Sequence, residues 1–316
     1  MTKIRIVTIN NDQTTNEILD WLRYYNPCTS IDRLNLKSDF LKLNKINEKS
    51  TIYIRKYRHL FESNIGKGYE VKPFNKKTEL IDYLQKSTND EIKIFIEHLM
   101  CSEKNNIIGN KNSFGENKLN WLEKAQKADL DIPKTLITNC KEELFNFISE
   151  CNSDIIIKPL YNAISYNYKK KLYVSYTNRL SNDLLNKLPK YFPVGLFQQE
   201  IKKEFEIRTF YFYGQCYSMA IFTQQNKQTS VDFRMYSNEK PNRMVPYLLS
   251  NEVKNKIQIL MNKLNLNTGS LDFIKGVDDK LYFLEVNPEG QFGMVSKPCN
   301  YYLEELVAKK IIDAIN

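Results

Sequence analysis

The strongest local signal in the sequence is Leu271-Asp272-Phe273, followed by Phe283-Leu284-Glu285-Val286-Asn287-Pro288. The segment Gly276-Val277-Asp278-Asp279 between them predicts a turn, so the two stretches are expected to pair as a β-hairpin. With the turn centred between Val277 and Asp278, Asp272 is expected opposite Phe283, and Glu285 is its diagonal neighbour. Because side chains alternate faces along a strand, Glu285 and Asn287 would share the face of Phe283.

Two carboxylates and an amide oxygen would then meet on one patch of this hairpin. Close carboxylates repel each other unless a cation lies between them. Mg²⁺ prefers a few carboxylate oxygens and completes its octahedron with water and nucleotide phosphate. Asp272, Glu285 and Asn287 are therefore candidate Mg²⁺ ligands. Spacing alone leaves open the alternative that the acidic side chains of the hairpin simply face solvent.

Two lysines upstream are candidates for binding phosphate. Lys158 ends the apolar run Ile155-Ile156-Ile157, so a buried strand is expected to carry it to a sheet edge, where ligands of α/β proteins bind. Lys118 lies near the start of a predicted helix. Lysine suits phosphate as a point charge, although in isolation a strand-end lysine more commonly extends into water.

A third signal is the stretch Gln198-Gln199-Glu200-Ile201-Lys202, which ends a strand expected over 195–201. The backbone N–H and C=O groups of such a strand can form hydrogen bonds with an adenine ring. Glu206, a few residues further on, could accept hydrogen bonds from ribose hydroxyls, and Arg208 follows on the same strand.

The pattern around these signals is α/β. Strands are expected over 3–9, 50–55, 132–138 and 154–159, with 170–176 pairing with 154–159, and a hairpin over 206–222 has its turn at Gly214. A capping box starts a helix at Thr14, and further helices are expected from 117, over 142–150 and 251–264, and from 301. With 316 residues, 42% of them hydrophobic, the chain can form two or three packed subdomains.

Composition excludes several classes of protein. No stretch approaches the ~20 apolar residues of a membrane span, and the N-terminus has the pattern of a strand and not of a signal peptide. The six cysteines are scattered, as reduced thiols of a cytoplasmic protein would be, and two histidines argue against histidine-based chemistry. The formal charge of +9 favours anionic partners, but its diffuse distribution does not indicate a nucleic-acid groove.

Taken in order, these signals resemble the ATP-grasp superfamily from about Asn110 to the end of the chain. The matching features are Asn117-Lys118, Ile132-Pro133-Lys134-Thr135, Ile156-Ile157-Lys158-Pro159, Gln199-Glu200-Ile201, Glu206-Ile207-Arg208 and Asp272 with Glu285-Val286-Asn287-Pro288. The resemblance implies an α/β (α+β) fold in three parts. These are an N-terminal pre-ATP-grasp domain (1–110), a central subdomain (111–202) and a C-terminal subdomain (203–316) that clasp ATP.

A narrower resemblance is to the graspetide (microviridin-type) ligases, in their grasp-with-spasm branch. It is carried by Asp12-Gln13-Thr14-Thr15, Ile18-Leu19-Asp20-Trp21-Leu22, Asn117-Lys118-Leu119, Glu206-Ile207-Arg208, Asp232-Phe233-Arg234 and Asn287-Pro288-Glu289-Gly290-Gln291-Phe292. Such enzymes phosphorylate an Asp or Glu side chain of a ribosomal precursor peptide, releasing ADP. A hydroxyl or amine of the same peptide then attacks the acyl phosphate, which closes a macrolactone or macrolactam.

The resemblance also implies roles for individual residues. Lys118 and Lys158 would hold the phosphates of ATP, and Glu206 would bind its ribose. The adenine would be bound by Gln199, Glu200, Ile201 and Lys202. The Mg²⁺ ligands would be Asp272, Glu285 and Asn287. Arg208 would steady the transferred phosphate. Arg234 would pair with the core carboxylate, while Asp232 would orient Arg234 or accept the proton of the nucleophile.

The implied partners are an acidic precursor peptide with leader and core, and a partner enzyme of the radical SAM/SPASM type; the resemblance also admits a homodimer. The leader would bind around 169–176. The sequence departs from the superfamily in one place, because 159–165, after Lys158, has no glycine for a phosphate-binding loop.

Two alternatives remain open at this level. One is an ATP-grasp ligase that adds a free amino acid to a small molecule or a protein tail. The other is a basic, non-enzymatic α/β protein that binds nucleic acid or an acidic partner, and its binding would weaken steeply with salt.

Overall fold

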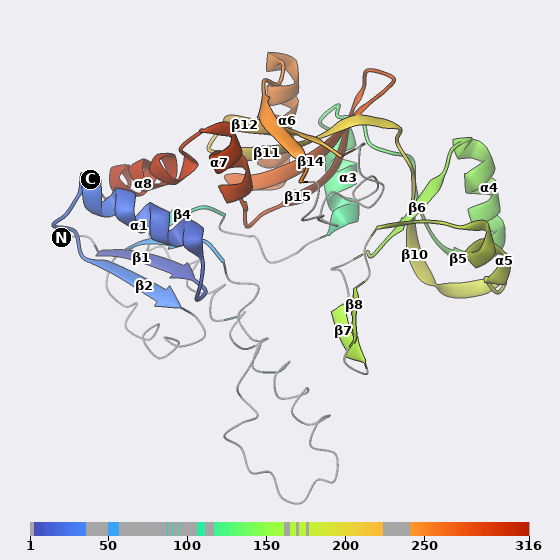
Figure 1. Cartoon of the computed structure of the whole chain (residues 1–316), viewed down its shortest axis with the longest axis horizontal. Helices are drawn as coiled ribbons and strands as arrows, with labels where there is room; N and C mark the ends of the chain where they lie inside the picture. The colour runs from blue at the N-terminus through green and yellow to red at the C-terminus, as the bar shows by residue number, and fades with distance from the viewer. Residues whose placement is uncertain are drawn as a thin grey trace, which may run out of the picture. The chain divides into compact units, whose positions relative to one another are not determined.

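The structure is a computed structural model of the chain. It describes residues 3–35, 50–56, 106–110, 117–160, 165–168, 171–174, 177–223 and 241–315, and three helical positions, 87, 91 and 94. The chain forms two compact units, and Figure 1 colours the described residues by their position along the chain. The first unit comprises Met1–Phe114, Asn265–Thr268 and Pro288–Asn316, and the second comprises Gly115–Leu264 and Gly269–Asn287.

The first unit is built on a parallel sheet with the strand order β2-β1-β3-β4. Its strands are β1 (Lys3–Thr8), β2 (Ile31–Asn35), β3 (Ser50–Ile54) and β4 (Asn106–Ile108). The helices of this unit whose bounds the structure describes are α1 (Gln13–Tyr25), α7 (Gly293–Cys299) and α8 (Leu303–Asp313), and α1 and α8 pack against each other. The first and last described parts of the chain therefore share one unit, as the blue and red ribbons of Figure 1 show.

The start of α1 differs from the expected capping box at Thr14. The N-cap is Asp12, two residues earlier. Its buried carboxylate accepts hydrogen bonds from the hydroxyls of Thr8 (2.9 Å) and Thr15 (2.7 Å) and pairs with Lys56 Nζ at 3.3 Å. Asp12 thus connects the end of β1 to the first turn of α1.

The second unit contains an antiparallel sheet with the order β5-β10-β6-β9. Its strands are β5 (Thr135–Cys140), β6 (Ile155–Lys158), β9 (Asn178–Arg179) and β10 (Tyr191–Gln199). The helices α4 (Lys141–Cys151) and α5 (Asn182–Lys187) contribute Leu144, Phe147 and Leu185 to a core that also includes Ile155, Phe192 and Phe197.

The expected pairing of 170–176 with the strand at 154–159 is wrong. Strand β8 (Lys171–Val174) pairs with β7 (Ser165–Tyr168) in a separate two-stranded ribbon. Strand β6 already has a neighbour on each side, because β10 pairs with one edge and β9 with the other.

The other large sheet of the second unit has the order β13-β12-β11-β14-β15. Its strands are β11 (Lys203–Phe212), β12 (Gln215–Phe222), β13 (Arg243–Tyr247), β14 (Thr268–Gly276) and β15 (Leu281–Asn287). The expected turn at Gly214 is confirmed, and its φ of +89° favours glycine. Helices α3 (Lys118–Gln126) and α6 (Asn251–Lys263) complete the unit.

The compact units differ from the expected three-part division in one respect. Residues after Asn287 return to the N-terminal sheet and do not stay with the C-terminal subdomain. The reason is the buried face of α8, where Leu303, Val307, Ala308 and Ile311 are covered within the first unit. The division into 1–110, 111–202 and 203–316 itself stays a prediction.

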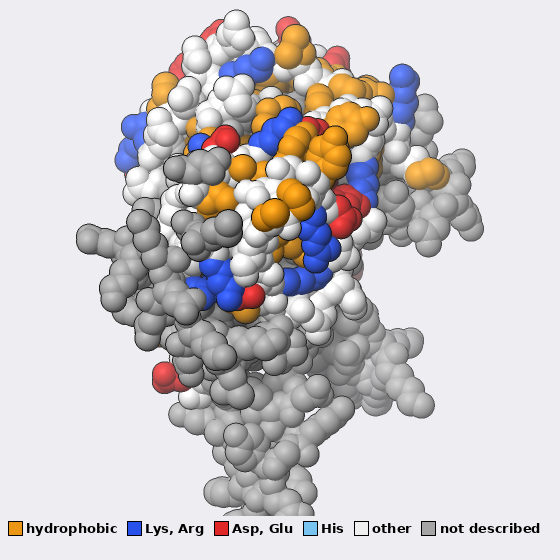
Figure 2. Space-filling view, turned by 90° about the vertical axis from the view of Figure 1, so that its left-hand side faces the viewer, with side chains coloured by type: hydrophobic (Ala, Val, Ile, Leu, Met, Phe, Trp, Pro, Cys, Tyr) orange, Lys and Arg blue, Asp and Glu red, His pale blue; other side chains and the backbone are white. Residues whose placement is uncertain are grey.

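The spread of basic side chains and the state of the cysteines match what the sequence predicts. In Figure 2, Lys and Arg side chains lie scattered among hydrophobic and other side chains of the viewed face and do not form a single patch. The described cysteines, Cys28, Cys140, Cys151, Cys216 and Cys299, are free thiols. Among the helices that the structure describes, none has the length and apolarity needed to cross a membrane.

Candidate active site

The hairpin of β14 and β15 presents its acidic side chains as a direct cross-strand pair. Asp272 lies opposite Glu285, and Ser270 lies opposite Asn287. The expected register, with Asp272 opposite Phe283, is wrong, because the pairing shifts between Asp272 and Phe273 and Phe273 faces Phe283.

The register shift is a β-bulge that leaves Leu284 without an opposite residue. The expectation that Glu285 and Asn287 point to the same face of the hairpin as Phe283 is therefore wrong as well. Phe283 and Val286 are both buried, opposite Phe273 and Leu271. The bulge therefore lets these apolar side chains enter the core while Asp272, Glu285 and Asn287 share the other face.

Arg208 provides a counter-charge for Asp272. Its Nη1 donates to both carboxylate oxygens at 3.1 Å, from the strand that neighbours β14 in the sheet. The two side chains are only 8% and 13% exposed. The Nε of Arg208 is also buried and has no hydrogen-bond partner among the described residues, so it remains available as a donor to an anionic ligand.

Lys118 connects this hairpin to the residue after β6. It occupies the first position of α3, whose N-cap Asn117 accepts hydrogen bonds from Leu119 N and Asn120 N. Lys118 Nζ donates to Pro159 O at 3.1 Å and lies 4.0 Å from Glu285 Oε2. The structure thus brings Lys118 close to Glu285 and to the neighbour of Lys158 in sequence.

Lys158 lies on the sheet face that α4 and α5 do not cover. Its partner across the strands is Leu196, whereas the neighbouring pair, Ile157 and Phe197, packs with the core under the helices. Gln198 shares the face of Leu196, two residues away on β10. Its amide Nε2 donates to Thr135 Oγ1 at 2.9 Å, and its Oε1 is buried without a partner among the described residues.

The segment Gln199-Glu200-Ile201-Lys202 contains the last residue of β10 and the connection to β11. The N–H groups of Gln199 and Glu200 donate to Lys134 O (2.9 Å) and Asp154 O (2.8 Å). Arg179 binds both carboxylate oxygens of Glu200 at 2.6 Å, so this side chain points to β9. Within the segment, the N–H groups of Ile201 and Lys202 remain as candidate donors to an adenine ring.

Glu206 lies on β11, two residues before Arg208 and on the same face. Its Oε1 accepts a hydrogen bond from Lys203 Nζ at 2.5 Å, and both side chains are 9% exposed. Lys203 is not a predicted site residue, and its spacing of three from Glu206 gives no signal for the pair, because side chains three apart on a strand ordinarily point to opposite faces. Asp232 and Arg234 lie outside the described residues.

The donor set at the hairpin fits Mg²⁺. Asp272, Glu285 and Asn287 carry hard oxygen atoms on one face, and Mg²⁺ takes one or two carboxylates and fills its remaining positions with water and phosphate. Within the part of the chain that the structure describes, no group of three or more His, Cys, Asp or Glu side chains is arranged to hold a metal.

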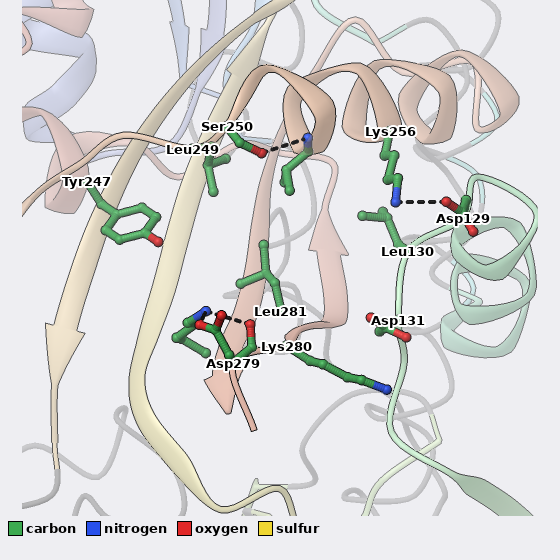
Figure 3. Close-up of a pocket in the computed structure, with 12 residues that line it drawn as sticks. Asp129, Leu130, Asp131, Tyr247, Leu249, Ser250, Lys256, Asp279, Lys280 and Leu281 are labelled. Atoms are coloured by element: carbon green, nitrogen blue, oxygen red, sulfur yellow. Dashed lines mark hydrogen bonds and ion pairs between the residues drawn. The ribbon is translucent and has the colours of Figure 1, made fainter. Parts of the chain in front are cut away.

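A separate cavity of about 410 Å³ lies at the turn end of the same hairpin (Figure 3). Lys275, Lys280 and Leu281 line it together with Asp131 and the start of α6. Two of the three lysines that line it have acidic partners, because Lys256 pairs with Asp129 at 2.7 Å and Lys275 pairs with Asp279. The cavity contains none of the predicted site residues and has no excess of one charge.

The architecture is that of the ATP-grasp fold, which the solved structures that the chain resembles also have. The RiPP-associated ATP-grasp ligase of Chryseobacterium gregarium, in complex with ADP and a leader and core peptide, matches with a TM-score of 0.79 and 18% identity, over 99% of this chain and 97% of that one. The macrocyclase MdnC of Microcystis aeruginosa MRC, bound with the precursor peptide MdnA, matches with a TM-score of 0.76 and 20% identity, over 99% and 100%.

A more remote match is the D-alanine–D-alanine ligase of Bacillus anthracis. Its TM-score is 0.55 at 13% identity, over 100% of this chain and 96% of that one. No family model and no curated protein matches the sequence. The predicted α/β ATP-grasp fold is confirmed.

Proposed function

We propose that the chain is an ATP-dependent, ADP-forming ligase that joins Asp or Glu side chains of a ribosomal precursor peptide to a hydroxyl or amine of the same peptide. The observation that carries this proposal is the group of Arg208, Asp272, Glu285 and Lys118 on an ATP-grasp fold. The two partly buried carboxylates could hold a metal ion, and the two cations beside them could contact the phosphates of a nucleotide.

The chemistry needs charge neutralisation and positioning. A carboxylate has a poor leaving group, and γ-phosphoryl transfer converts it to an acyl phosphate that a hydroxyl or amine can displace. Such transfer depends on positioning and electrostatic stabilisation more than on covalent help from the protein. Mg²⁺, when bound, would supply part of the positive charge that the phosphates need.

Different side chains of the site would bind the metal, the phosphates and the ribose. Asp272, Glu285 and Asn287 would hold the metal, and Lys118 and Lys158 would hold phosphates. Arg208, whose Nε lacks a partner among the described residues, would contact the transferred phosphoryl group. The carboxylate of Glu206 would accept hydrogen bonds from the ribose hydroxyls.

The adenine would lie against the connection between β10 and β11. The N–H groups of Ile201 and Lys202 would face it, since those of Gln199 and Glu200 already have acceptors. Gln198 Oε1 adds a buried acceptor that the adenine amino group could satisfy. By its resemblance alone, Arg234 would bind the substrate carboxylate, and Asp232 would support it.

A precursor peptide is the favoured substrate because two structures with TM-scores of 0.79 and 0.76 are of ligases bound to such peptides, while the D-alanine–D-alanine ligase reaches 0.55. The formal charge of +9 suits an acidic peptide with leader and core. A partner enzyme of the radical SAM/SPASM type, a homodimer and a cytoplasmic location complete the proposal.

Mass spectrometry of the full chain with Mg-ATP tests it. The substrate is the small peptide encoded beside the gene that carries Asp or Glu together with Ser, Thr or Lys. Loss of one water per ring, with ADP released and fragmentation locating the bond, is the expected result. An unchanged peptide, with ATP consumed only when free amino acids are supplied, would contradict the peptide substrate and favour a small-molecule ligase.

A further inference from the structure

A single buried side chain, that of Asn110, holds both ends of the β14–β15 hairpin. It is 6% exposed and follows β4 in the first unit. Its Nδ2 donates to Thr268 O at 2.8 Å and to Pro288 O at 2.6 Å. Its Oδ1 accepts from Asn267 N at 2.8 Å and from Thr268 N at 3.1 Å.

These four hydrogen bonds use the full capacity of a carboxamide, which has two donor hydrogens and two acceptor lone pairs. No other natural side chain of this size offers that combination. Aspartate has the shape but lacks the donors, and leucine has neither donors nor acceptors. The position therefore requires asparagine for a chemical reason and not for its volume.

The partners of Asn110 are the residues at which the chain enters and leaves the hairpin. Thr268 is the first residue of β14, and Pro288 directly follows Asn287, the last residue of β15. The pair of Ser270 with Asn287 is the last pair of the two strands at this end of the hairpin. The Asn110 side chain bridges the hairpin at this point, as a short backbone segment would.

The backbone before Asn110 is shaped for this contact. Gly109 has φ +109°, a conformation that L side chains rarely adopt. The carbonyl oxygen of Gly109 accepts a hydrogen bond from Asn267 Nδ2 at 3.4 Å. Gly109 thus turns the chain at the end of β4 so that Asn110 meets the hairpin ends.

We propose that Asn110 is a positioning residue that sets the geometry of the candidate metal ligands, an inference that rests on the proposed function. By fixing the ends of β14 and β15, Asn110 fixes where the Asn287 side chain lies relative to Asp272 and Glu285. Mg²⁺ demands near-ideal octahedral geometry, so a ligand on a loosened strand end lowers its affinity.

The experiment measures ADP binding to the purified full chain by calorimetry, with and without Mg²⁺, and thermal unfolding of the same samples. The variants are Asn110→Ala and the isosteric Asn110→Asp. Changes to groups that orient metal ligands typically cost about 10–100-fold in metal affinity. The Mg²⁺ concentration for half-maximal enhancement of ADP binding should therefore rise about tenfold, while ADP binding without Mg²⁺ stays as in the wild type.

Asn106→Ala is the matched control. Asn106 begins β4, and its Nδ2 also donates to a backbone carbonyl, Ala314 O at 2.8 Å, which is not part of the hairpin. This variant should keep the wild-type Mg²⁺ dependence. A second, independent change is Gly109→Ala, which strains the turn and should reproduce the effect of Asn110→Ala.

Wild-type Mg²⁺ dependence in a folded Asn110→Asp protein would overturn the inference, whatever happens to the stability of Asn110→Ala. The inference would also be overturned if Asn106→Ala raised the Mg²⁺ concentration for half-maximal enhancement of ADP binding as much as Asn110→Ala does. Failure of the proposed function looks different, because ADP binding of the wild-type chain itself would then not respond to Mg²⁺.

Discussion

Arg208 and Asp272 form a nearly buried ion pair in which Nη1 of the arginine contacts both carboxylate oxygens at 3.1 Å. Asp272 is also the cross-strand partner of Glu285, so Arg208 neutralises part of a site where two acidic side chains face each other. Breaking a buried ion pair by removing one partner is costly, because the other charge stays behind uncompensated. The pair therefore affects both stability and ligand binding.

Arg208→Ala should destabilise the second unit by about 3 kcal/mol, and the double variant Arg208→Ala/Asp272→Ala by less than the sum of the single changes, with a coupling energy of about 1–3 kcal/mol. Urea unfolding can follow this unit through Trp121 in a Trp21→Phe background, since these two are the tryptophans of the chain. Strict additivity of the two changes would show that the ion pair contributes nothing.

Glu285→Ala should abolish ligation and leave the fold intact, because the lost carboxylate is a candidate metal ligand, 27% exposed and outside the core. We expect kcat/KM to fall by at least about 100-fold, the upper end of what altered metal surroundings cost. Asp279→Ala, at the exposed turn of the same hairpin, should retain wild-type turnover. Unchanged turnover of Glu285→Ala would remove Glu285 from the Mg²⁺ site.

Lys158→Ala should weaken ADP binding by about 10- to 150-fold, since a charge-assisted hydrogen bond contributes about 1.5–3 kcal/mol. Calorimetry with and without this substitution measures the change. The control is Lys134→Ala, whose Nζ donates to Glu150 O at the surface of the same unit. Equal affinities of the Lys158→Ala and wild-type proteins would rule out a phosphate contact of Lys158.

Asp12 should make the stability of the first unit depend on pH. Burial raises its pKa, but Arg55, Thr15, Lys56 and Thr8 outweigh this effect and hold the pKa below its ordinary value. A carboxyl group with a lowered folded-state pKa stabilises the protein above its unfolded pKa of about 3.9, and this contribution disappears as pH falls through the folded value.

The measurement compares wild type with Asp12→Asn in a Trp121→Phe background, where Trp21 on α1 reports the first unit. At pH 7 the variant should be less stable by about 2 kcal/mol, as expected for hydrogen bonds to a charged group, and the difference should shrink below about pH 4. A difference that stays constant down to pH 2, or grows in acid, would contradict the ionised state of Asp12.

The order of motifs along the sequence resembles that of the ATP-grasp superfamily, and the fold that this resemblance predicts is confirmed. Strand-end Lys158, the helix at Lys118 and the hairpin with Asp272 and Glu285 are local patterns, and local hydrophobic periodicity specifies the elements that carry them. The strand at 170–176 was placed on the wrong neighbour, because pairing depends on which edge of β6 remains open in three dimensions.

Residue types and their spacing along the chain predict candidates for binding metal and phosphate, because both are local properties of each predicted strand or helix. Which of these candidates lie together depends on how the strands pair in three dimensions. The bulge at Leu284 places Asp272 opposite Glu285, because Phe283 and Val286 must both be buried, and strict alternation of side chains cannot satisfy both demands. Asn110 contacts Thr268 and Pro288 at separations of 158 and 178 residues, and no local pattern encodes hydrogen bonds over such distances in the chain.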